Sequence, residues 1–398
     1  MGAVDVAASY VFGLPYIEMA RTRAAFHAAG APTGRFVHTR KLTSAADRWI
    51  TTPNNDTPYS NAWLDLSHGP VELVTPEFGD RYWSVALMAM TTDNFAIIGT
   101  RTYGNRPGRF LIVGPDWQGD GGDWTVLRSP TNWVWALARV LVDGPDDLAA
   151  VHALQDLLIL TPRQAQPPAR LPAPLIEGDA ADYFRLLREL LADNPPGAAD
   201  RDAVANLATV AGDSMVEGYA LGVAHVRGGG SMGKRNAVNG WNVPPAVIGV
   251  YGSEYGIRAG VALGGLGALP PEEAMYLSAG GAHLVGSTAF RLIFAADAPV
   301  PVQAFWSLTL YERTPEGRLF FFDNPLDRYA IGDRSPGLRH SEDGSLEILI
   351  QAARPHGHEG NWLPAPAGRY SLNLRCYLPK PALLDGTWQP PRLLPVAM

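Results

Sequence analysis

The sequence predicts a mainly β protein with helices, of the α+β class, in which two jelly-roll-like β-modules are separated by a helical segment. Three observations support this fold class. From about residue 35 to 145, short runs of β-branched and aromatic residues alternate with Gly, Pro, Asn and Asp, which is typical of a sandwich or jelly roll. From about 146 the periodicity becomes helical. From about 283 the strand pattern returns.

A chain of 398 residues is too long for one ordinary core, so we divide it into four parts. They are an N-terminal helix (1–34), a first β-module (35–145), a helical segment (146–282) and a second β-module (283–398). The N-terminal helix is expected over residues 5–29, because apolar residues recur there at helical spacings and Gly30 follows as a natural stop.

Strands are clearest where β-branched and aromatic residues form short runs. In the first module these are VELVTP (71–76), RYWSVALM (81–88), NFAIIGTRTYG (94–104) and GRFLIVGP (108–115). In the second they are HLVGSTAFRLIFA (283–295), VQAFWSLTLYE (302–312), LFFFD (319–323), LEILIQAARP (346–355) and GRYSLNLRCYLP (368–379).

Helices are expected over 146–160, 181–193 and 200–224, where acidic first turns or apolar stripes occur. PPEEAMY (270–276) opens a further short helical turn. Prolines precede Glu272 and Glu273 there, so we interpret both glutamates as capping residues rather than as a catalytic carboxylate pair.

Two pairs of segments correspond between the two β-modules. YWSVAL (82–87) aligns with FWSLTL (305–310), and GRFLIV (108–113) aligns with GRYSLNL (368–374). The repeated aromatic-Trp-Ser-apolar-x-Leu pattern favours two related modules on either side of the helical segment.

Longer motifs resemble one family of bacterial proteins. They include PNNDTPYSNAWLDLS, GDRYWSVALM, GWNVPPAVIGVYGSEYGIRA, NPLDRYAIGDR, DGSLEILIQ, NWLPAP and LRCYLPKPALLDGTW. The chain resembles proteins that pair two domains of unknown function, numbered 1254 at the N-terminal side and 1214 at the C-terminal side. The resemblance implies a pair of jelly-roll-like modules similar in outline to a double jelly roll, and it implies no particular reaction.

Composition excludes several partners. With 46% hydrophobic and 18% charged residues the chain is typical of a globular protein, and its formal net charge of −7 gives no electrostatic reason to bind nucleic acid or an anionic membrane. No apolar run approaches the roughly 18 residues that span a bilayer, and the N-terminus does not resemble a signal peptide. We therefore expect a cytoplasmic protein without a membrane span, unless a leader preceded this sequence.

The densest polar motif is PNNDTPYSNAWLDL (53–66). Its asparagines suit turn chemistry, while Asp56 and Tyr59 could face a cavity. Comparable positions where loops meet strands hold Asn54, Asn55, Trp63, Arg81, Tyr82 and Asn94 in the first module, and Asn324, Arg328, Tyr329, Asn361 and Trp362 in the second. An Arg near Asp and Tyr can clamp a substrate carboxylate or carbonyl, or it can simply tie loops together.

The segment FWSLTLYE predicts two different strand faces. Because alternate side chains point to opposite sides, Trp306, Leu308 and Leu310 should face a core. Phe305, Ser307, Thr309 and Tyr311 should share the other face, which suits a pocket lining or a set of satisfied sheet hydroxyls.

Three further motifs are weaker. GGGSMGK (228–234) matches both a nucleophile-elbow and a dinucleotide-loop string around Ser231, but no helix is predicted after it, so we interpret it as a loop. His356 and His358, with Glu359, could bind a transition metal or lie in a surface loop. Cys376, in an alternating strand, is expected to be a buried inert thiol.

The leading hypothesis is an enzyme, or a small-molecule-binding protein, that acts without a cofactor on an apolar or aromatic metabolite by acid–base chemistry of lyase, isomerase or hydrolase type. Asp56 would be the general acid or base, Tyr59 and Tyr311 proton donors, and Arg81 or Arg328 the charge stabiliser. Asn54, Asn55, Trp63, Tyr82, Asn94, Ser307, Thr309, Asn324, Tyr329, Asn361 and Trp362 would bind the substrate. The alternatives are a non-catalytic assembly module and a metal-assisted hydrolase. We expect a homo-oligomer and assign no metal ligands.

Overall fold

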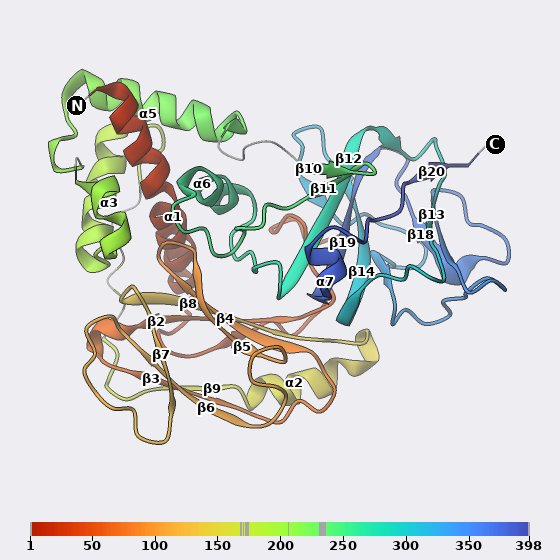
Figure 1. Ribbon diagram of the computed structural model, residues 1–398, viewed down its shortest axis with the longest axis horizontal. Helices are drawn as coiled ribbons and strands as arrows, with labels where there is room; N and C mark the ends of the chain where they lie inside the picture. Colours follow the sequence, from red (N-terminus) through yellow and green to blue (C-terminus); the bar gives the residue numbers. More distant parts are fainter. Residues whose placement is uncertain are drawn as a thin grey trace.

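The N-terminal β-module consists of two sheets packed face to face (Figure 1). The computed structural model describes residues 2–167, 169, 171, 175–205, 207–230 and 236–396. One sheet has the strand order β1 (Val37–His38), β2 (Tyr59–Asp65), β8 (Trp133–Val140), β4 (Trp83–Ala89) and β5 (Asn94–Gly99). The other has the order β7 (Thr125–Arg128), β6 (Gly108–Val113), β3 (Val71–Thr75) and β9 (Ile159–Pro162).

The C-terminal β-module is also built from two sheets. The larger has the order β10 (Asn236–Val238), β11 (Trp241–Val243), β12 (Ala274–Val285), β19 (Arg369–Pro379), β14 (Val302–Arg313) and β15 (Leu319–Phe320), and β16 (Ala330–Gly332) also pairs with β14. The smaller has the order β18 (Trp362–Pro364), β17 (Leu346–Gln351), β13 (Phe290–Phe294) and β20 (Leu394–Pro395). As predicted, Trp306, Leu308 and Leu310 face the core between these two sheets.

Seven α-helices lie within the described residues: α1 (Ala3–Ala28), α2 (Leu148–Asp156), α3 (Ala180–Asp193), α4 (Arg201–Val204), α5 (Gly212–Arg227), α6 (Tyr255–Gly264) and α7 (Pro381–Leu384). Short 3-10 turns cover Leu66–His68, Pro145–Asp147, Ala198–Asp200, Leu207–Thr209 and Glu359–Asn361. Helices and strands together confirm the α+β class. Most pairings are antiparallel, but β6 pairs with β7, and β17 with β18, in parallel. The connectivity of a double jelly roll is not confirmed.

Several elements differ from the sequence prediction. The helix predicted over 146–160 ends at Asp156, because Ile159 and its neighbours pair with β3 as strand β9. The helix predicted over 200–224 is divided into α4 and α5. In the segment 319–323 only Leu319 and Phe320 form a strand. Tertiary pairing overrides local propensity in the first of these cases.

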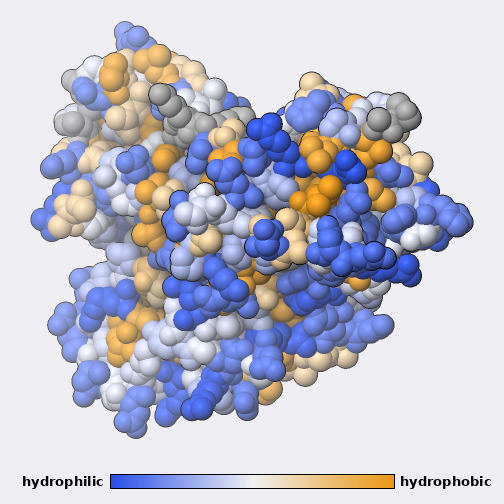
Figure 2. All heavy atoms as spheres, turned by 45° about the vertical axis from the view of Figure 1, so that its right-hand side comes forward, coloured by the Kyte–Doolittle hydropathy of each residue, from blue (hydrophilic) through white to orange (hydrophobic). Residues whose placement is uncertain are grey.

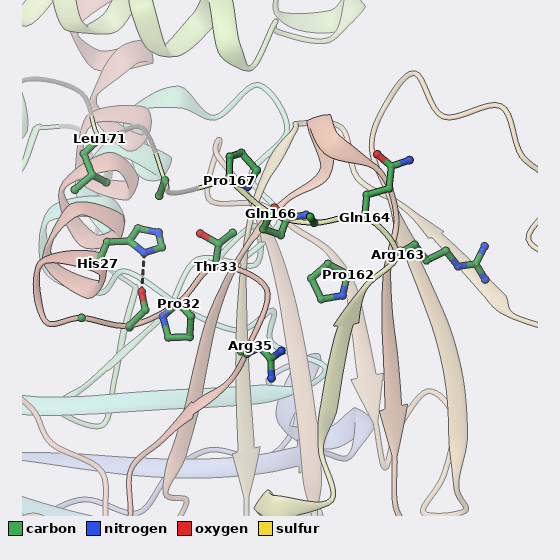
Figure 3. Close-up of a pocket in the computed structure, with 14 residues that line it drawn as sticks. His27, Pro32, Thr33, Arg35, Pro162, Arg163, Gln164, Gln166, Pro167 and Leu171 are labelled. Carbon is green, nitrogen blue, oxygen red and sulfur yellow. Dashed lines mark hydrogen bonds between the residues drawn. The ribbon is translucent and has the colours of Figure 1, made fainter.

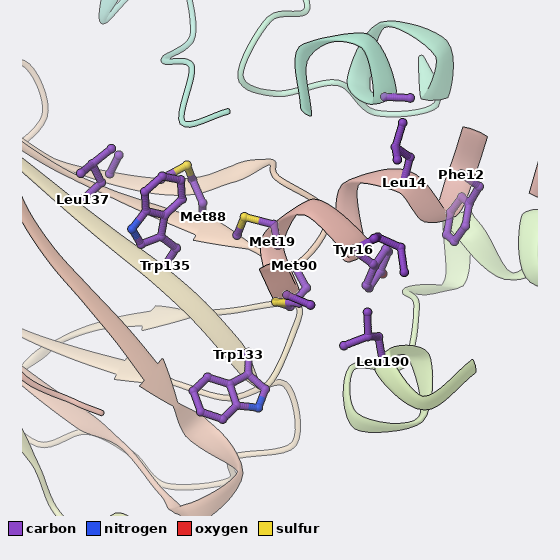
Figure 4. Close-up of a cluster of buried hydrophobic side chains, with 14 of the residues drawn as sticks. Phe12, Leu14, Tyr16, Met19, Met88, Met90, Trp133, Trp135, Leu137 and Leu190 are labelled. Atoms are coloured by element: carbon purple, nitrogen blue, oxygen red, sulfur yellow. The ribbon is translucent and has the colours of Figure 1, made fainter. Parts of the chain in front are cut away.

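Helix α1 begins after Gly2, whose backbone N–H donates to Asp5 Oδ2 in the first turn at 3.0 Å. The helix lies between the outer face of the five-stranded sheet and the other helices (Figure 4). Phe12, Tyr16 and Met19 on α1 share one hydrophobic cluster with Met88 and Trp135 on the sheet. Each such buried side chain contributes about 1.5–3 kcal/mol to folding.

In Figure 2, hydrophilic residues cover most of one face of the molecule, and hydrophobic side chains gather at the upper right, over the C-terminal module. Among the described residues, no helix combines the length and the apolar character that crossing a bilayer requires.

Candidate functional site between the two β-modules

The outer faces of the two large sheets meet at the junction of the modules (Figure 1). Strand alternation places Tyr82 on the outer face of β4, because Trp83 and Val85 point into the sandwich core. Phe305 on β14 and Tyr377 on β19 lie on the outer face of the C-terminal sheet by the same rule. The ring of Tyr82 contacts both, at centroid distances of 5.8 Å to Phe305 and 5.2 Å to Tyr377.

Each large sheet carries the same row of four residues across four strands. In the N-terminal module the row is Tyr59, Arg139, Ser84 and Gly99. In the C-terminal module it is Tyr276, Arg375, Ser307 and Gly332. The two serines belong to the aligned segments YWSVAL and FWSLTL, so the strand pairing supports that correspondence. The second alignment is not supported, because GRFLIV is β6 in a small sheet whereas GRYSLNL lies in β19 of a large one.

The two arginines of these rows are buried, with 4% of Arg139 and 3% of Arg375 exposed. Each guanidinium lies over the tyrosine of its own row, at 5.2 Å from the Tyr59 ring and 5.5 Å from the Tyr276 ring. Arginine stays protonated inside proteins, so two positive charges are held at the junction and stabilised in part by the ring faces.

Arg375 is well supplied with hydrogen-bond acceptors. Its Nη1 donates to Thr309 Oγ1 and its Nη2 to Tyr311 Oη, both at 2.5 Å. The Asp56 carboxylate is close enough to interact electrostatically with it. Tyr311 in turn donates to the Pro53 carbonyl at 2.8 Å, which ties the loop before β2 to β14.

The loop 53–58 brings Asp56 into this cluster through turn chemistry. Asn54 Oδ1 accepts a 2.7 Å hydrogen bond from Asp56 N, which is the turn that the sequence predicted for this asparagine. Ser307 Oγ donates to Asp56 Oδ2 at 2.6 Å across the junction of the modules. The Asn54 amide also donates to Tyr377 Oη at 3.2 Å. The loop therefore connects polar groups of both modules.

Tyrosine hydroxyls complete the cluster and remain protonated at neutral pH. Tyr276 Oη lies 2.9 Å from Tyr377 Oη. Burial raises the pKa of Tyr82 and Tyr377 well above the usual range. Burial also raises the pKa of Tyr311 to about 12, although Arg375 partly offsets it. These phenols are hydrogen-bond donors rather than tyrosinates.

Glu273 corrects the sequence interpretation of PPEEAMY. A single turn at 270–274 leads directly into β12, and the Glu273 side chain is 0% exposed. Its carboxylate accepts a 2.8 Å hydrogen bond from Tyr82 Oη and a 2.7 Å one from Arg101 Nε. It therefore links the two modules and does not cap a helix, whereas Glu272 is exposed.

A cleft of about 620 Å³ opens at the edge of the cluster. Tyr82 and Leu141 line it, and Val142, the neighbour of Leu141, donates its backbone N–H to the Asp56 carbonyl at 2.9 Å. The Asp56 side chain does not itself line the cleft. Arg334 lies over the Phe305 ring at 4.4 Å and pairs with Asp143 of the other module at 2.9 Å. The cleft therefore has walls from both modules.

Family models match both β-modules. The model described as a protein of unknown function (DUF1254) matches residues 33–162, and the model described as a protein of unknown function (DUF1214) matches residues 273–381. The chain carries both domains, in this order. The cluster thus lies at the junction of the two domains, with Asp56, Tyr59 and Arg139 from DUF1254 and Ser307 and Arg375 from DUF1214.

The fold of this chain is shared with a protein of known structure. The crystal structure of the VPA0106 protein from Vibrio parahaemolyticus is similar over 99% of this chain and 100% of its own, with a TM-score of 0.76 and 23% sequence identity. At that identity the likeness shows the fold alone. A putative uncharacterized protein from Burkholderia cenocepacia aligns over 97% of this chain and 87% of its own, with a TM-score of 0.47 and 15% identity. No curated protein matches the sequence.

The structure brings seven of the predicted site residues together at the domain junction: Asn54, Asp56, Tyr59, Tyr82, Ser307, Thr309 and Tyr311. Arg81 lines the cleft, where it forms a bidentate pair with Asp147 and donates to the Leu141 carbonyl.

The other predicted residues lie outside the cluster. Most of them make contacts within one domain, but Asn94 bonds the segment between the two domains, and Tyr329 bonds Ala45 of the DUF1254 domain. Asn55 bonds both backbone groups of Thr43, and Asn94 donates to the Gly249 and Ala268 carbonyls. Trp63 stacks on Trp135 in the DUF1254 domain.

In the DUF1214 domain, Arg328 donates to the carbonyls of Glu359, Gly360 and Trp362, and Trp362 donates to the Gln351 carbonyl. Asn324 holds its own turn, Asn361 bonds the Arg339 backbone, and Tyr329 Oη accepts from Ala45 N.

The weaker motifs do not contribute to this site. Ser231 and Lys234 lie outside the described residues, so the loop prediction for them is untested. His356 and His358 are exposed, and no group of three potential metal ligands occurs in the described part of the chain. Cys376 is fully buried, and burial raises the pKa of its thiol, as expected for an inert cysteine.

Sequence reasoning missed Arg139, Glu273, Tyr276, Arg375 and Tyr377. A signal for the two arginines was present, since each is a lone charge inside an apolar strand segment, WALARV and NLRCYL. A buried strand tolerates such a charge only with a specific environment.

Two further pockets contain no predicted site residue. The first, of about 750 Å³, lies between His27 at the end of α1 and the segment after β9 (Figure 3), and the second, of about 800 Å³, lies beside β10–β12.

Proposed function

We propose that the protein binds a small organic molecule with apolar or aromatic parts at the domain junction and acts on it by acid–base chemistry that needs no cofactor. The observation that carries the proposal is the convergence of the Asp56 carboxylate, the Ser307 hydroxyl and the Arg375 guanidinium at the domain junction, where a cleft of about 620 Å³ opens at Tyr82. Cavities of 300–1,000 Å³ with a few convergent polar groups are typical of small-molecule sites.

Each group has a chemical role that follows from its contacts. Asp56 accepts or returns a proton, and the 2.6 Å hydrogen bond from Ser307 orients its carboxylate. Arg375 stabilises negative charge that develops on the substrate. Tyr59 and Tyr311 are the proton donors, and Tyr311 suits this role because its high pKa keeps the phenol protonated. The reaction class is a lyase, isomerase or hydrolase step.

Aromatic side chains at the junction support the substrate class. Tyr82 lines the cleft, and its ring contacts the buried rings of Phe305 and Tyr377. No phosphate-binding loop is found in the described residues around the cleft. We further propose that the two β-modules are jelly-roll-like and related, supported by their matching Tyr-Arg-Ser-Gly rows, and that the protein forms a homo-oligomer.

Native mass spectrometry before and after mild denaturation tests binding and assembly together. An organic molecule released on denaturation supports the proposal and identifies the ligand class. A well-defined oligomer that carries no molecule, and that binds none in a screen of small aromatic metabolites, would instead favour a non-catalytic assembly module.

Substitution of Asp56 tests the chemistry. With the substrate so identified, Asp56→Asn should lower turnover by about 10²–10⁴-fold, as is usual for a general acid or base. Asp116→Asn is the matched control and should leave turnover unchanged, because Asp116 is exposed and follows strand β6 of the smaller N-terminal sheet. A folded Asp56→Asn protein that loses no more than about threefold contradicts the assignment.

A further inference from the structure

We propose that Arg139 binds a carboxylate group of the small molecule at the domain junction. This inference rests on the proposed function of the same site and adds the charge of its ligand. It follows from the comparison of two arginines that occupy equivalent positions in the two domains but have different surroundings.

The equivalence of Arg139 and Arg375 is set by strand register. Arg139 pairs with Tyr59 on one side and Ser84 on the other, and Arg375 pairs with Tyr276 and Ser307 in the same order. Both guanidinium groups lie over the tyrosine of their row. Part of the difference in their partners lies in the neighbouring strand, where Thr309 and Tyr311 of β14 occupy the positions that Ala86 and Met88 occupy in β4.

Their hydrogen-bond partners differ clearly. Arg375 has two hydroxyl acceptors within the described structure, and the Asp56 carboxylate acts on its charge. Arg139 Nη2 donates to the Gly267 carbonyl at 2.9 Å, while its Nε and Nη1 have no partner among the described residues. No ion pair within the described part of the chain includes Arg139, which is 4% exposed.

A buried guanidinium without an anion is costly, because the charge has lost its hydration and gained no opposite charge. The groups in electrostatic range of Arg139 are the phenols of Tyr59, Tyr82, Tyr276 and Tyr377. Burial keeps Tyr82 and Tyr377 neutral at physiological pH. They can stabilise an anion by hydrogen bonds, but they do not neutralise the arginine.

The Arg139 N–H groups that have no partner indicate which chemical group of a ligand would bind there. Guanidinium N–H groups recognise planar oxyanions in a bidentate manner, and a carboxylate matches this geometry. One unpaired guanidinium balances one negative charge. Arg139 does not line the cleft, but it is in electrostatic range of Tyr82, which does. The arginines that line the cleft are already paired, Arg81 with Asp147, Arg101 with Glu273 and Arg334 with Asp143, so a phosphate dianion would lack a second counter-charge. A monocarboxylate with an aromatic or apolar body fits both the charge and the rings.

Binding of benzoate and of its neutral counterpart benzyl alcohol, measured by isothermal titration calorimetry or ligand-observed NMR, tests the inference. The wild-type protein should bind benzoate at least tenfold more tightly than benzyl alcohol, since hydrogen bonds to charged groups contribute about tenfold or more in affinity. Arg139→Met should remove this preference, and Arg139→Lys should retain part of it. Arg109→Met, at an exposed arginine of the same domain, should not change it.

Urea unfolding of the two equivalent variants gives an independent readout. Arg139→Met removes a charge that has no internal counter-charge, so the unfolding midpoint should stay the same or rise. Arg375→Met leaves Asp56 without its cation, so the midpoint should fall. An Arg139→Met protein that fails to fold, or that loses as much stability as Arg375→Met, overturns the inference, because Arg139 would then be a structural residue.

The outcomes separate this inference from the proposed function. Equal binding of benzoate and benzyl alcohol, unchanged in Arg139→Met, overturns the carboxylate inference but leaves a small-molecule site at the junction. Absence of binding of both probes up to about 10 mM to the folded wild-type protein also overturns it. In that case the molecule released in native mass spectrometry decides whether the proposed function still stands.

Discussion

The Tyr82 hydroxyl donates a 2.8 Å hydrogen bond to the Glu273 carboxylate across the junction of the two domains. Both side chains are buried, and Arg101 Nε donates to the second carboxylate oxygen at 2.7 Å. A buried carboxylate that holds one group from β4 and another from the segment after β5 fixes the edge of the cleft. Stability and cleft geometry are therefore coupled through Glu273.

Glu273→Ala should lower the free energy of unfolding by about 1–3 kcal/mol, because the Tyr82 hydroxyl then lacks its acceptor in a buried position. Arg101 is 33% exposed, so water can compensate its loss in part. Glu272→Ala is the matched control: the neighbouring glutamate is exposed and its removal should change stability by less than about 0.5 kcal/mol. Urea denaturation of both variants measures the difference, and equal effects would contradict this account.

The equivalent glycines of the two rows predict equivalent sensitivity to substitution. A Cβ at Gly99 would lie 2.4 Å from the Trp83 carbonyl oxygen, and a Cβ at Gly332 would lie 2.2 Å from the Trp306 carbonyl oxygen. Both obstacles are backbone atoms of the neighbouring strand and cannot rotate away. Gly99→Ala and Gly332→Ala should each cost about 1–3 kcal/mol of stability, as overpacking usually does.

Gly264→Ala is the control for these glycines, because a Cβ there meets no atom within 4 Å. It should be neutral or stabilising by up to about 1 kcal/mol, since alanine restricts the unfolded chain more than glycine does. Thermal unfolding of the three variants tests the prediction. A Gly99→Ala or Gly332→Ala protein as stable as wild type would show that the strands separate more easily than their register implies.

Local patterns predicted the strands and their faces well. FWSLTLYE divides into a core face and a junction face because side-chain alternation depends only on neighbouring residues. The same is true of the turn at Asn54, whose side chain bonds the backbone two residues later. The family resemblance was also readable, because its motifs extend along the chain.

The composition of the cluster was not predictable in the same way. Arg139 and Arg375 reach Ser84 and Ser307 only through pairing of strands that are distant in the sequence. Glu273 looks like a capping residue locally, and its partner Tyr82 is 191 residues away. Arg81 and Arg328 stood out because they are near Asp and Tyr in the sequence, yet they bond Asp147 and backbone carbonyls. A lone arginine in an apolar strand marks a buried charge, but a local pattern does not tell which distant residues it contacts.

His38 should make stability depend on pH in the mildly acidic range. Burial, with a smaller effect of Arg40, lowers the pKa of His38 to about 4, and its Nδ1 lies 2.7 Å from Ser60 Oγ. The unfolded chain, in which the pKa is near 6.5, therefore binds more protons between pH 6.5 and 4. The stabilisation is complete above pH 6.5 and is lost as the pH falls towards 4.

Because His38 is only half-buried, we expect the free energy of unfolding to fall by about 1 kcal/mol over this pH range, well below the value for a fully shielded group. Urea denaturation at pH 7.5, 6 and 4.5 measures it. In His38→Gln the difference between pH 7.5 and 4.5 should shrink by that amount, while in His340→Gln, at an exposed histidine, it should not change. If the free energy of unfolding changed with pH in the same way in wild type and His38→Gln, the prediction would be contradicted.

The junction tyrosines should also make the stability of the folded protein fall at alkaline pH. Burial raises the pKa of Tyr311 to about 12 and that of Tyr82 and Tyr377 well above the usual range. Groups whose pKa is raised by folding stabilise the native state fully below pH 10, and this stabilisation is lost as the pH rises further.

The absorbance of tyrosinate near 295 nm measures this ionisation. In 8 M urea all 14 tyrosines should ionise in one phase near pH 10. In the folded protein a fraction should ionise only together with the loss of the far-UV circular dichroism signal. If all of them ionised reversibly before unfolding, the junction would be open to solvent and the buried cluster described above would be wrong.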